Sequence, residues 1–207
     1  MKHDRSCLSH WFPLVRDAGL PVPKTVIVKA PDLSPWLSLK RGQSLMAGFD
    51  GFFSELANAC AEVGDFPVFL RTGHGSAKHG WQDTCFVPSF KVLLDHVYAI
   101  FEWSHEVDML GLPTNVWAVR EFLKTDPIFK AFEGFPVTKE RRYFVRDGEV
   151  ICHHPYWPEK AVEEGSPRLL SRPFQVDLPV TDWRERLAEM NAEPASEIEE
   201  LTALSLR

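Results

Sequence analysis

The stretch FLRTGHGSAKHGW, from Phe69 to Trp81, combines the residue types of an anion-binding loop. An apolar run ends on Arg71, whose guanidinium stays charged in proteins, and a loop that contains two glycines follows. An arginine at the end of an apolar strand must either find a partner or face a cleft. The stretch therefore favours a phosphate-type ligand, and a purely structural ion pair remains a second interpretation.

The loop that follows this arginine offers further hydrogen-bond donors. Gly73 and Gly75 allow backbone N–H groups to converge on an anion, and Thr72, Ser76 and Lys78 add side-chain donors. The letters complete neither the Walker A motif nor GxGxxG. Taken alone, the loop is therefore somewhat more typical of an ordinary Gly-rich hairpin than of an anion site.

The stretch VREFL, from Val119 to Leu123, predicts a strand with mixed faces. Glu121 alternates with apolar residues on one face, whereas Arg120 and Phe122 lie on the other face. Strands that line a cleft mix charged and apolar side chains in this way, and so do edge strands.

The stretch ERRYFV places a carboxylate and a guanidinium on one face of a strand. Glu140, Arg142 and Phe144 are alternate residues, so their side chains project from the same side. A carboxylate next to a guanidinium can hold a ribose hydroxyl and a phosphate side by side. An exposed charge pair without a ligand is the alternative.

Helices and strands alternate along the chain, which favours a layered α/β or α+β domain. Helical spacing of apolar residues predicts helices over Leu8 to Ala18, Phe52 to Ala61 and Val92 to Phe101, with an acidic helical segment from Thr181 to Leu206. Short apolar runs predict strands within Leu20 to Val28, Pro67 to Arg71, Thr84 to Val87 and Asn115 to Leu123. The Asp147-Gly148 pair predicts a hairpin turn.

The composition excludes several classes of partner. The chain has 207 residues and a formal net charge of -6, so it lacks the basic footprint of a general nucleic-acid or membrane-surface protein. No apolar run reaches the length of a membrane span, and the first residues do not have the layout of a signal peptide. We therefore expect a cytoplasmic protein that binds neither nucleic acid nor membrane.

The four cysteines, Cys7, Cys60, Cys85 and Cys152, are scattered without any CxxC spacing. This pattern favours neither a disulfide framework nor a thiolate zinc site, and we expect the thiols to be reduced and mostly buried.

In their order along the chain, FLRTGHGSAKHGW, VREFL and ERRYFVRDGEVICHHPYW resemble the ATP-grasp superfamily of nucleotide-dependent ligases. The likeness is greatest to a bacterial and phage group in which an arginine replaces the usual strand lysine. AGLPVPKTVIV is similar to the helix, turn and strand that open many such domains, and the resemblance covers roughly Leu8 to Trp157.

The resemblance implies an α+β fold of two lobes, with mainly antiparallel sheets and packed helices. It divides the chain into an N-terminal part (1–65), a nucleotide-loop lobe (66–122) and an incomplete C-terminal lobe (123–207). The expected cofactors are ATP and Mg²⁺. The expected substrate is a small-molecule or peptide carboxylate, activated as an acylphosphate and joined to an amine or a similar group.

The resemblance also implies a role for each matching residue. Arg71 would contact the α- and β-phosphates, Lys78 would add a phosphate contact, and the backbone after Arg120 would meet the adenine. The cofactor-binding residues implied in this way are Arg71, Gly73, Gly75, Ser76, Lys78, Glu121, Phe122, Leu123, Glu140 and Arg142.

The sequence departs from the superfamily where the magnesium ligands should come. These ligands belong to a late strand pair that ends in a Glu-x-Asn motif, and the chain offers that spacing only at Glu189-Met190-Asn191, within a segment of helical character. A truncated chain, a naturally shortened protein and a diverged domain would each explain this. Whether the chain is an enzyme therefore stays open, and the alternative is a catalytically inactive binding module completed by a partner chain.

A zinc-dependent hydrolase is a further alternative because histidines are frequent in two stretches. The candidate ligands are His74, His79, Cys152, His153 and His154. No HxxxH or HExxH spacing occurs, and adjacent residues of a strand point to opposite faces, so the pattern disfavours zinc.

Overall fold

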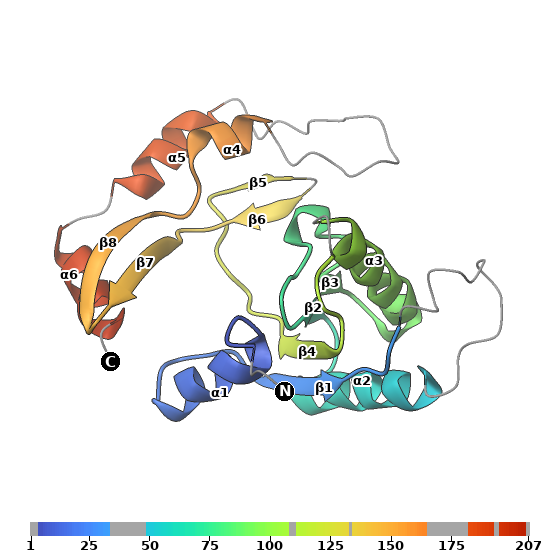
Figure 1. Ribbon diagram of the computed structural model, residues 1–207. Coiled ribbons are helices and arrows are strands. Elements are labelled where there is room, and N and C mark those ends of the chain that lie inside the picture. The colour runs from blue at the N-terminus through green and yellow to red at the C-terminus, as the bar shows by residue number, and fades with distance from the viewer. Residues whose placement is uncertain are drawn as a thin grey trace. The chain divides into compact units, whose positions relative to one another are not determined.

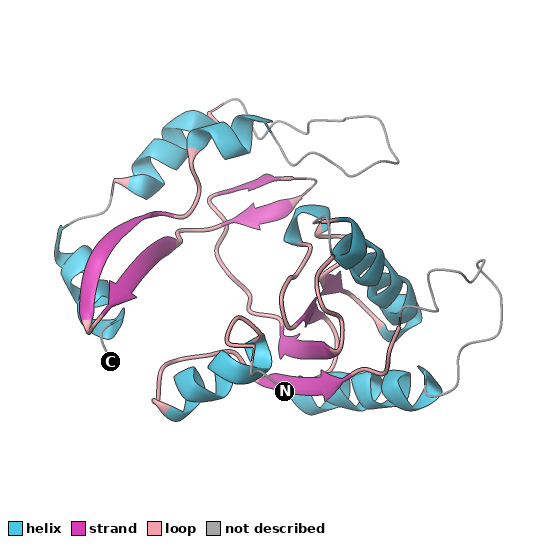
Figure 2. Cartoon of the chain, in the orientation of Figure 1, coloured by secondary structure: helices cyan, strands magenta, loops and turns pink. Residues whose placement is uncertain are grey.

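The computed structural model describes residues 4–33, 49–107, 111–132, 134–164, 182–192 and 195–205. It is a mixed α+β structure with small antiparallel sheets and several helices (Figures 1 and 2). The chain forms two compact units, Met1–Leu123 and Lys124–Arg207.

In its described residues, the first unit contains a four-stranded antiparallel sheet and three α-helices. The elements are α1 (Leu8–Asp17), β1 (Thr25–Lys29), α2 (Phe49–Val63), β2 (Val68–Thr72), β3 (Phe86–Val87), α3 (Leu93–Glu106) and β4 (Val116–Glu121), with short 3-10 helices η2 (Lys78–Gly80) and η3 (Phe90–Val92). The strand order is β1-β4-β2-β3, so β4 is paired on both sides.

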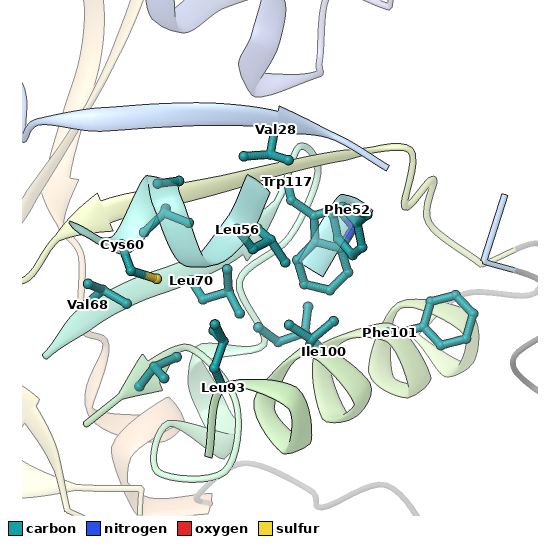
Figure 3. Close-up of a cluster of buried hydrophobic side chains, with 14 of the residues drawn as sticks. Val28, Phe52, Leu56, Cys60, Val68, Leu70, Leu93, Ile100, Phe101 and Trp117 are labelled. Atoms are coloured by element: carbon teal, nitrogen blue, oxygen red, sulfur yellow. The ribbon is translucent and has the colours of Figure 1, made fainter. Parts of the chain in front are cut away.

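The main core lies between one face of this sheet and the helices α2 and α3. Figure 3 shows Leu56 of α2 and Ile100 of α3 pointing toward Leu70 and Trp117 on the strands, and all four side chains are fully buried. Alternation along β2 and β4 explains the arrangement, because every second residue of a strand faces the same side. The face bearing Leu70 is therefore fixed as the interior.

The opposite face of the sheet meets α1. Leu8 and Phe12 of this helix pack on Ala118, which alternates with the core residues Trp117 and Val119 along β4. The first four residues of β4 are all buried because helices cover both sides of this strand. The face that carries Ala118 is called the α1 face below.

The part of the second unit that the structure describes contains two hairpins and three helices. Its elements are β5 (Phe129–Ala131), β6 (Phe135–Val137), β7 (Arg141–Arg146), β8 (Glu149–Pro155), α4 (Glu159–Glu164), α5 (Trp183–Asn191) and α6 (Ala195–Ser205). Asp147 and Gly148 connect β7 to β8 with φ values of 52° and 78°, the left-handed pair that a tight hairpin turn requires. The predicted hairpin is confirmed, whereas sequence patterns missed β5 and β6.

No helix within the described ranges is both long enough and apolar enough to cross a membrane. The four cysteines are all free: Cys7, Cys60 and Cys85 are buried, and Cys152 on β8 is exposed. Burial raises the pKa of Cys60 to about 11 and that of Cys85 to about 12. Since the thiolate is the nucleophile, these two buried thiols are unreactive near neutral pH.

We predict that one cysteine in four reacts quickly with a thiol reagent in the folded chain. Iodoacetamide labelling at pH 7.5, followed by peptide mapping, should modify Cys152 first and reach Cys60 and Cys85 only after denaturant is added. Cys152→Ser is the matched variant and should remove the fast phase. Fast labelling of Cys85 in the folded protein would contradict the described packing.

Candidate anion-binding site

Arg71 lies on the α1 face of the sheet in the first unit. On β2 it alternates with the buried Leu70 and pairs with Ala118 of β4, so its side chain projects away from the main core. Its Nε donates a hydrogen bond to the carbonyl oxygen of Thr72 over 3.0 Å. The residue that sequence patterns placed at the end of an apolar strand is therefore half-buried on the second face of that strand.

Arg120 lies on the same face as Arg71. It pairs with Phe69 across the β2–β4 ladder, two residues from the Arg71–Ala118 pair, so the two arginines are diagonal neighbours. Arg120 Nε donates to Oγ1 of Thr25 over 3.2 Å, and its Cζ lies 5.7 Å from the centre of the Phe12 ring. The fold thus brings together two half-buried guanidinium groups from different strands.

The two guanidinium groups have no carboxylate within ion-pair distance among the residues that the structure describes. Burial lowers the pKa of Arg71. The pKa of Arg120 is lowered mainly by burial and, to a smaller extent, by the positive charge of Arg71. Both pKa values start so high that the groups stay charged at neutral pH. Two neighbouring, partly desolvated cations are unfavourable unless an anion neutralises them.

Lys78 is the other cation of this loop that the sequence predicts to contact phosphate. Burial dominates the raised pKa of Cys85, and the positive charges of Lys78 and Arg71 both act to lower it. Lys78 opens η2, and the preceding Ala77 is buried with a φ of 50°. The hydroxyl of Thr84 fixes this turn by donating to the Ala77 carbonyl over 2.8 Å. Lys78 and Arg71 therefore both act electrostatically on one buried thiol.

An aromatic cluster borders the arginines. Trp81 stacks on Phe86 with ring centres 4.5 Å apart, and Phe122 lies 5.1 Å from Phe86 and 5.8 Å from Trp81. Phe86 pairs with Phe69 of β2, which places Phe86 on the face that carries the arginines. Apolar rings beside cationic groups suit a ligand with both a flat ring and an anionic part.

Gly73 and Gly75 have structural tasks in the turn after β2. The N–H of Gly73 donates to the Val116 carbonyl over 2.8 Å, and the N–H of Gly75 donates to Oγ1 of Thr72 over 3.0 Å. A Cβ on Gly73 would lie 2.5 Å from Cys7 Sγ, and one on Gly75 would lie 2.6 Å from Cη2 of Trp103. These glycines allow close packing, and their N–H groups are already used within the protein.

His74 is held by the N-terminal segment. Its Nε2 lies 2.6 Å from Oδ2 of Asp4, and its Nδ1 is buried without a partner among the described residues. Hydrogen bonds from the Ser6 hydroxyl and then from His74 lower the pKa of Asp4 to about 2. Ser76, the remaining predicted donor of this loop, is half-buried, and its hydroxyl has no hydrogen-bond partner in the described structure.

The predicted adenine-contact segment ends the first unit. The carboxylate of Glu121 accepts a hydrogen bond from the Lys24 N–H over 2.7 Å, and the Glu121 N–H donates to the Lys24 carbonyl over 2.9 Å. Glu121 thus ties the entry of β1 to β4. Phe122 belongs to the aromatic cluster, and the Leu123 side chain is exposed.

Glu140 and Arg142 belong to the second unit. The carboxylate of Glu140 accepts hydrogen bonds from Trp157 Nε1 and Thr138 Oγ1, both over 3.1 Å. The guanidinium of Arg142 lies over the Tyr156 ring, with its Cζ 4.6 Å from the ring centre. Within the second unit, Glu140 and Arg142 therefore contact Trp157 and Tyr156 in the segment that follows β8.

The described residues do not gather the candidate metal ligands into one cluster. They contain no group of three His, Cys, Asp or Glu side chains able to hold a metal ion. His154 Nδ1 donates to the Pro155 carbonyl over 2.6 Å, and His153 Nδ1 lies 3.0 Å from Nη1 of Arg141. Glu189-Met190-Asn191 lies in α5, where Asn191 donates to the Trp157 carbonyl over 3.3 Å. The side chain of His79 lies outside the described residues.

Comparison of the chain with known protein families, with curated proteins and with solved structures finds no match.

The site residues that sequence patterns missed are Arg120 and Phe86, whereas the position of Trp81 beside the loop already suggests that it packs on whatever the loop covers. The alternation in VREFL already put Arg120 and Phe122 on one face. That this face also carries Arg71 depends on the register between β2 and β4, which no local pattern contains.

We predict that Gly75→Ala destabilises the protein because the added methyl group meets the Trp103 ring. Overpacking of this kind costs about 1 to 3 kcal/mol of unfolding free energy. Gly51→Ala is the matched control, since nothing lies within 4 Å of a Cβ at this position in α2. That control should leave stability unchanged or raise it by about 0.5 to 1 kcal/mol. Urea denaturation measures both, and equal stability of Gly75→Ala and wild type would contradict the described turn.

Proposed function

We propose that this chain is an ATP-binding protein of the ATP-grasp type, related to ligases that join a carboxylate to an amine or a similar group through an acylphosphate. The observation that carries the proposal is the half-buried charge of Arg71, which has no carboxylate partner among the described residues. The ordered resemblance of FLRTGHGSAKHGW, VREFL and ERRYFVRDGEVICHHPYW supports the choice of ligand.

The chemistry of the first unit suits a nucleoside triphosphate. The guanidinium of Arg71 would bind phosphate oxygens in a bidentate manner, and Lys78, whose charge acts on the same thiol as that of Arg71, would act as a point charge. The cluster of Trp81, Phe86 and Phe122 would provide an apolar contact for the base. ATP therefore matches both chemical features of this face.

Ligase chemistry of this type depends on positioning and charge neutralisation. Fixed cations around the phosphates stabilise the charge that develops during phosphoryl transfer to a carboxylate. When bound, Mg²⁺ would supply positive charge that neutralises the phosphates. The described residues contain no group of three His, Cys, Asp or Glu side chains to hold it, so we assign no step to the metal.

A binding module without turnover is the second candidate. The observation that favours it is the position of Glu189 and Asn191 on the helix α5, with the Asn191 amide engaged by the Trp157 carbonyl. The one Glu-x-Asn spacing near the C-terminus is thus used in packing. A partner chain would have to supply the acidic ligands in this case.

Calorimetric titration of the full chain with a non-hydrolysable ATP analogue, with and without magnesium, tests the proposal. We expect saturable binding that weakens about 10- to 100-fold in Arg71→Met, because a hydrogen-bonded charge contact to phosphate is lost. Arg146→Met is the matched control, since Arg146 is highly exposed at the tip of the β7–β8 hairpin.

Equal affinity of Arg71→Met and wild type would contradict the assignment of Arg71. Absence of binding to the wild-type chain in both conditions would contradict the proposed function itself. Binding with little dependence on magnesium would favour the module without turnover.

A further inference from the structure

We infer that Arg120 is a second phosphate-binding residue, and that Arg71 and Arg120 together bind adjacent phosphates of a di- or triphosphate. This inference rests on the proposed function, and it assigns a ligand class to a residue that the sequence resemblance leaves without a role. It follows from the register, the hydrogen bonds and the charges of the α1 face.

The register places the two guanidinium groups within reach of one ligand. Arg71 and Arg120 stand on neighbouring strands, project from the same face and are offset by two residues. Such diagonal neighbours have Cα atoms about 7 to 8 Å apart, and long side chains can meet across that distance. Their electrostatic coupling is direct, since the charge of Arg71 lowers the pKa of Arg120.

Each arginine is anchored through Nε and keeps its terminal nitrogens available. Arg71 Nε is bonded to the Thr72 carbonyl and Arg120 Nε to the Thr25 hydroxyl. Neither residue has a further hydrogen bond or ion pair among the described residues. The anchors fix the orientation of both guanidinium planes, and this lowers the entropic cost of binding an anion.

The number of donors favours a polyphosphate over a single phosphate. A guanidinium binds two oxygens in its bidentate mode, so a phosphate monoester with three oxygens can serve two guanidiniums only if they share an oxygen. A diphosphate supplies enough oxygens for both groups. The α1 face should therefore prefer ADP and ATP to AMP, and pyrophosphate to inorganic phosphate.

A purely structural role for Arg120 predicts a different outcome. In that case the contacts with Phe12 and Thr25 would stabilise the fold, and their loss would lower the unfolding midpoint without changing the ligand preference. A ligand-binding role predicts the reverse. Removing one of two repelling cations should leave the midpoint of the free protein unchanged or raised, and should abolish the preference for polyphosphates.

The test uses the full-length wild type, Arg120→Met and Arg120→Lys, each titrated with AMP, ADP, ATP and pyrophosphate. Thermal unfolding of the free proteins is measured in parallel. Arg120→Lys keeps the charge and the aliphatic stem, so it reports on the site even where Arg120→Met folds poorly. Arg146→Met again serves as the control.

We expect wild type to bind ADP at least tenfold more tightly than AMP. In Arg120→Met, most of this preference for ADP over AMP should be lost. Arg120→Lys should bind ADP more weakly than wild type because lysine cannot form the bidentate contact. Combining Arg71→Met with Arg120→Met should reduce the binding free energy by less than the sum of the two single changes, because both residues hold one ligand.

The inference would be overturned if wild type binds ATP and both Arg120 variants keep the wild-type ratio of ADP affinity to AMP affinity. The proposed function would then still stand. Binding of pyrophosphate without any binding of ATP would support the arginine pair and contradict the nucleotide assignment. Failure of wild type to bind any of the four probes would overturn both.

Discussion

The antiparallel register between β2 and β4 is the constraint on which the first unit depends. By pairing Arg71 with Ala118 and Phe69 with Arg120, it sends Leu70, Trp117 and Val119 to the α2–α3 core and both arginines to the opposite face. A slip of one residue would turn one strand over relative to the other, and would place one of the two guanidinium groups in the main core. The large apolar residues on the core face therefore also fix the position of the cations.

The arginine pair is electrostatically unfavourable in the absence of a ligand. Each guanidinium loses part of its hydration, neither gains a carboxylate among the described residues, and the two groups repel each other. Proteins tolerate such arrangements where a bound anion compensates for them, and perturbed charges cluster at functional sites for this reason. A bound phosphate ligand would neutralise the two guanidinium groups and so remove the electrostatic cost that destabilises the free protein.

Local patterns predicted much of the fold and only part of the site. The helices near Leu8, Phe52 and Leu93 and the hairpin at Asp147-Gly148 follow from apolar spacing and turn chemistry, and the structure confirms them. The strands β5 and β6 were missed because each has three residues and β6 contains Pro136. The tasks of Gly73 and Gly75 could not be predicted, since they arise from contacts with Cys7 and Trp103 that depend on tertiary packing.

The central claim is that one phosphate-bearing ligand meets Arg71 and Arg120 at the same time. The most direct measurement is NMR of the arginine Nε–Hε resonances of the full chain during titration with ATP. The structure predicts that the signals of Arg71 and Arg120 shift along one common saturation curve, while that of the exposed Arg146 stays in place. Saturation by ATP with neither of the two signals shifting would contradict the account.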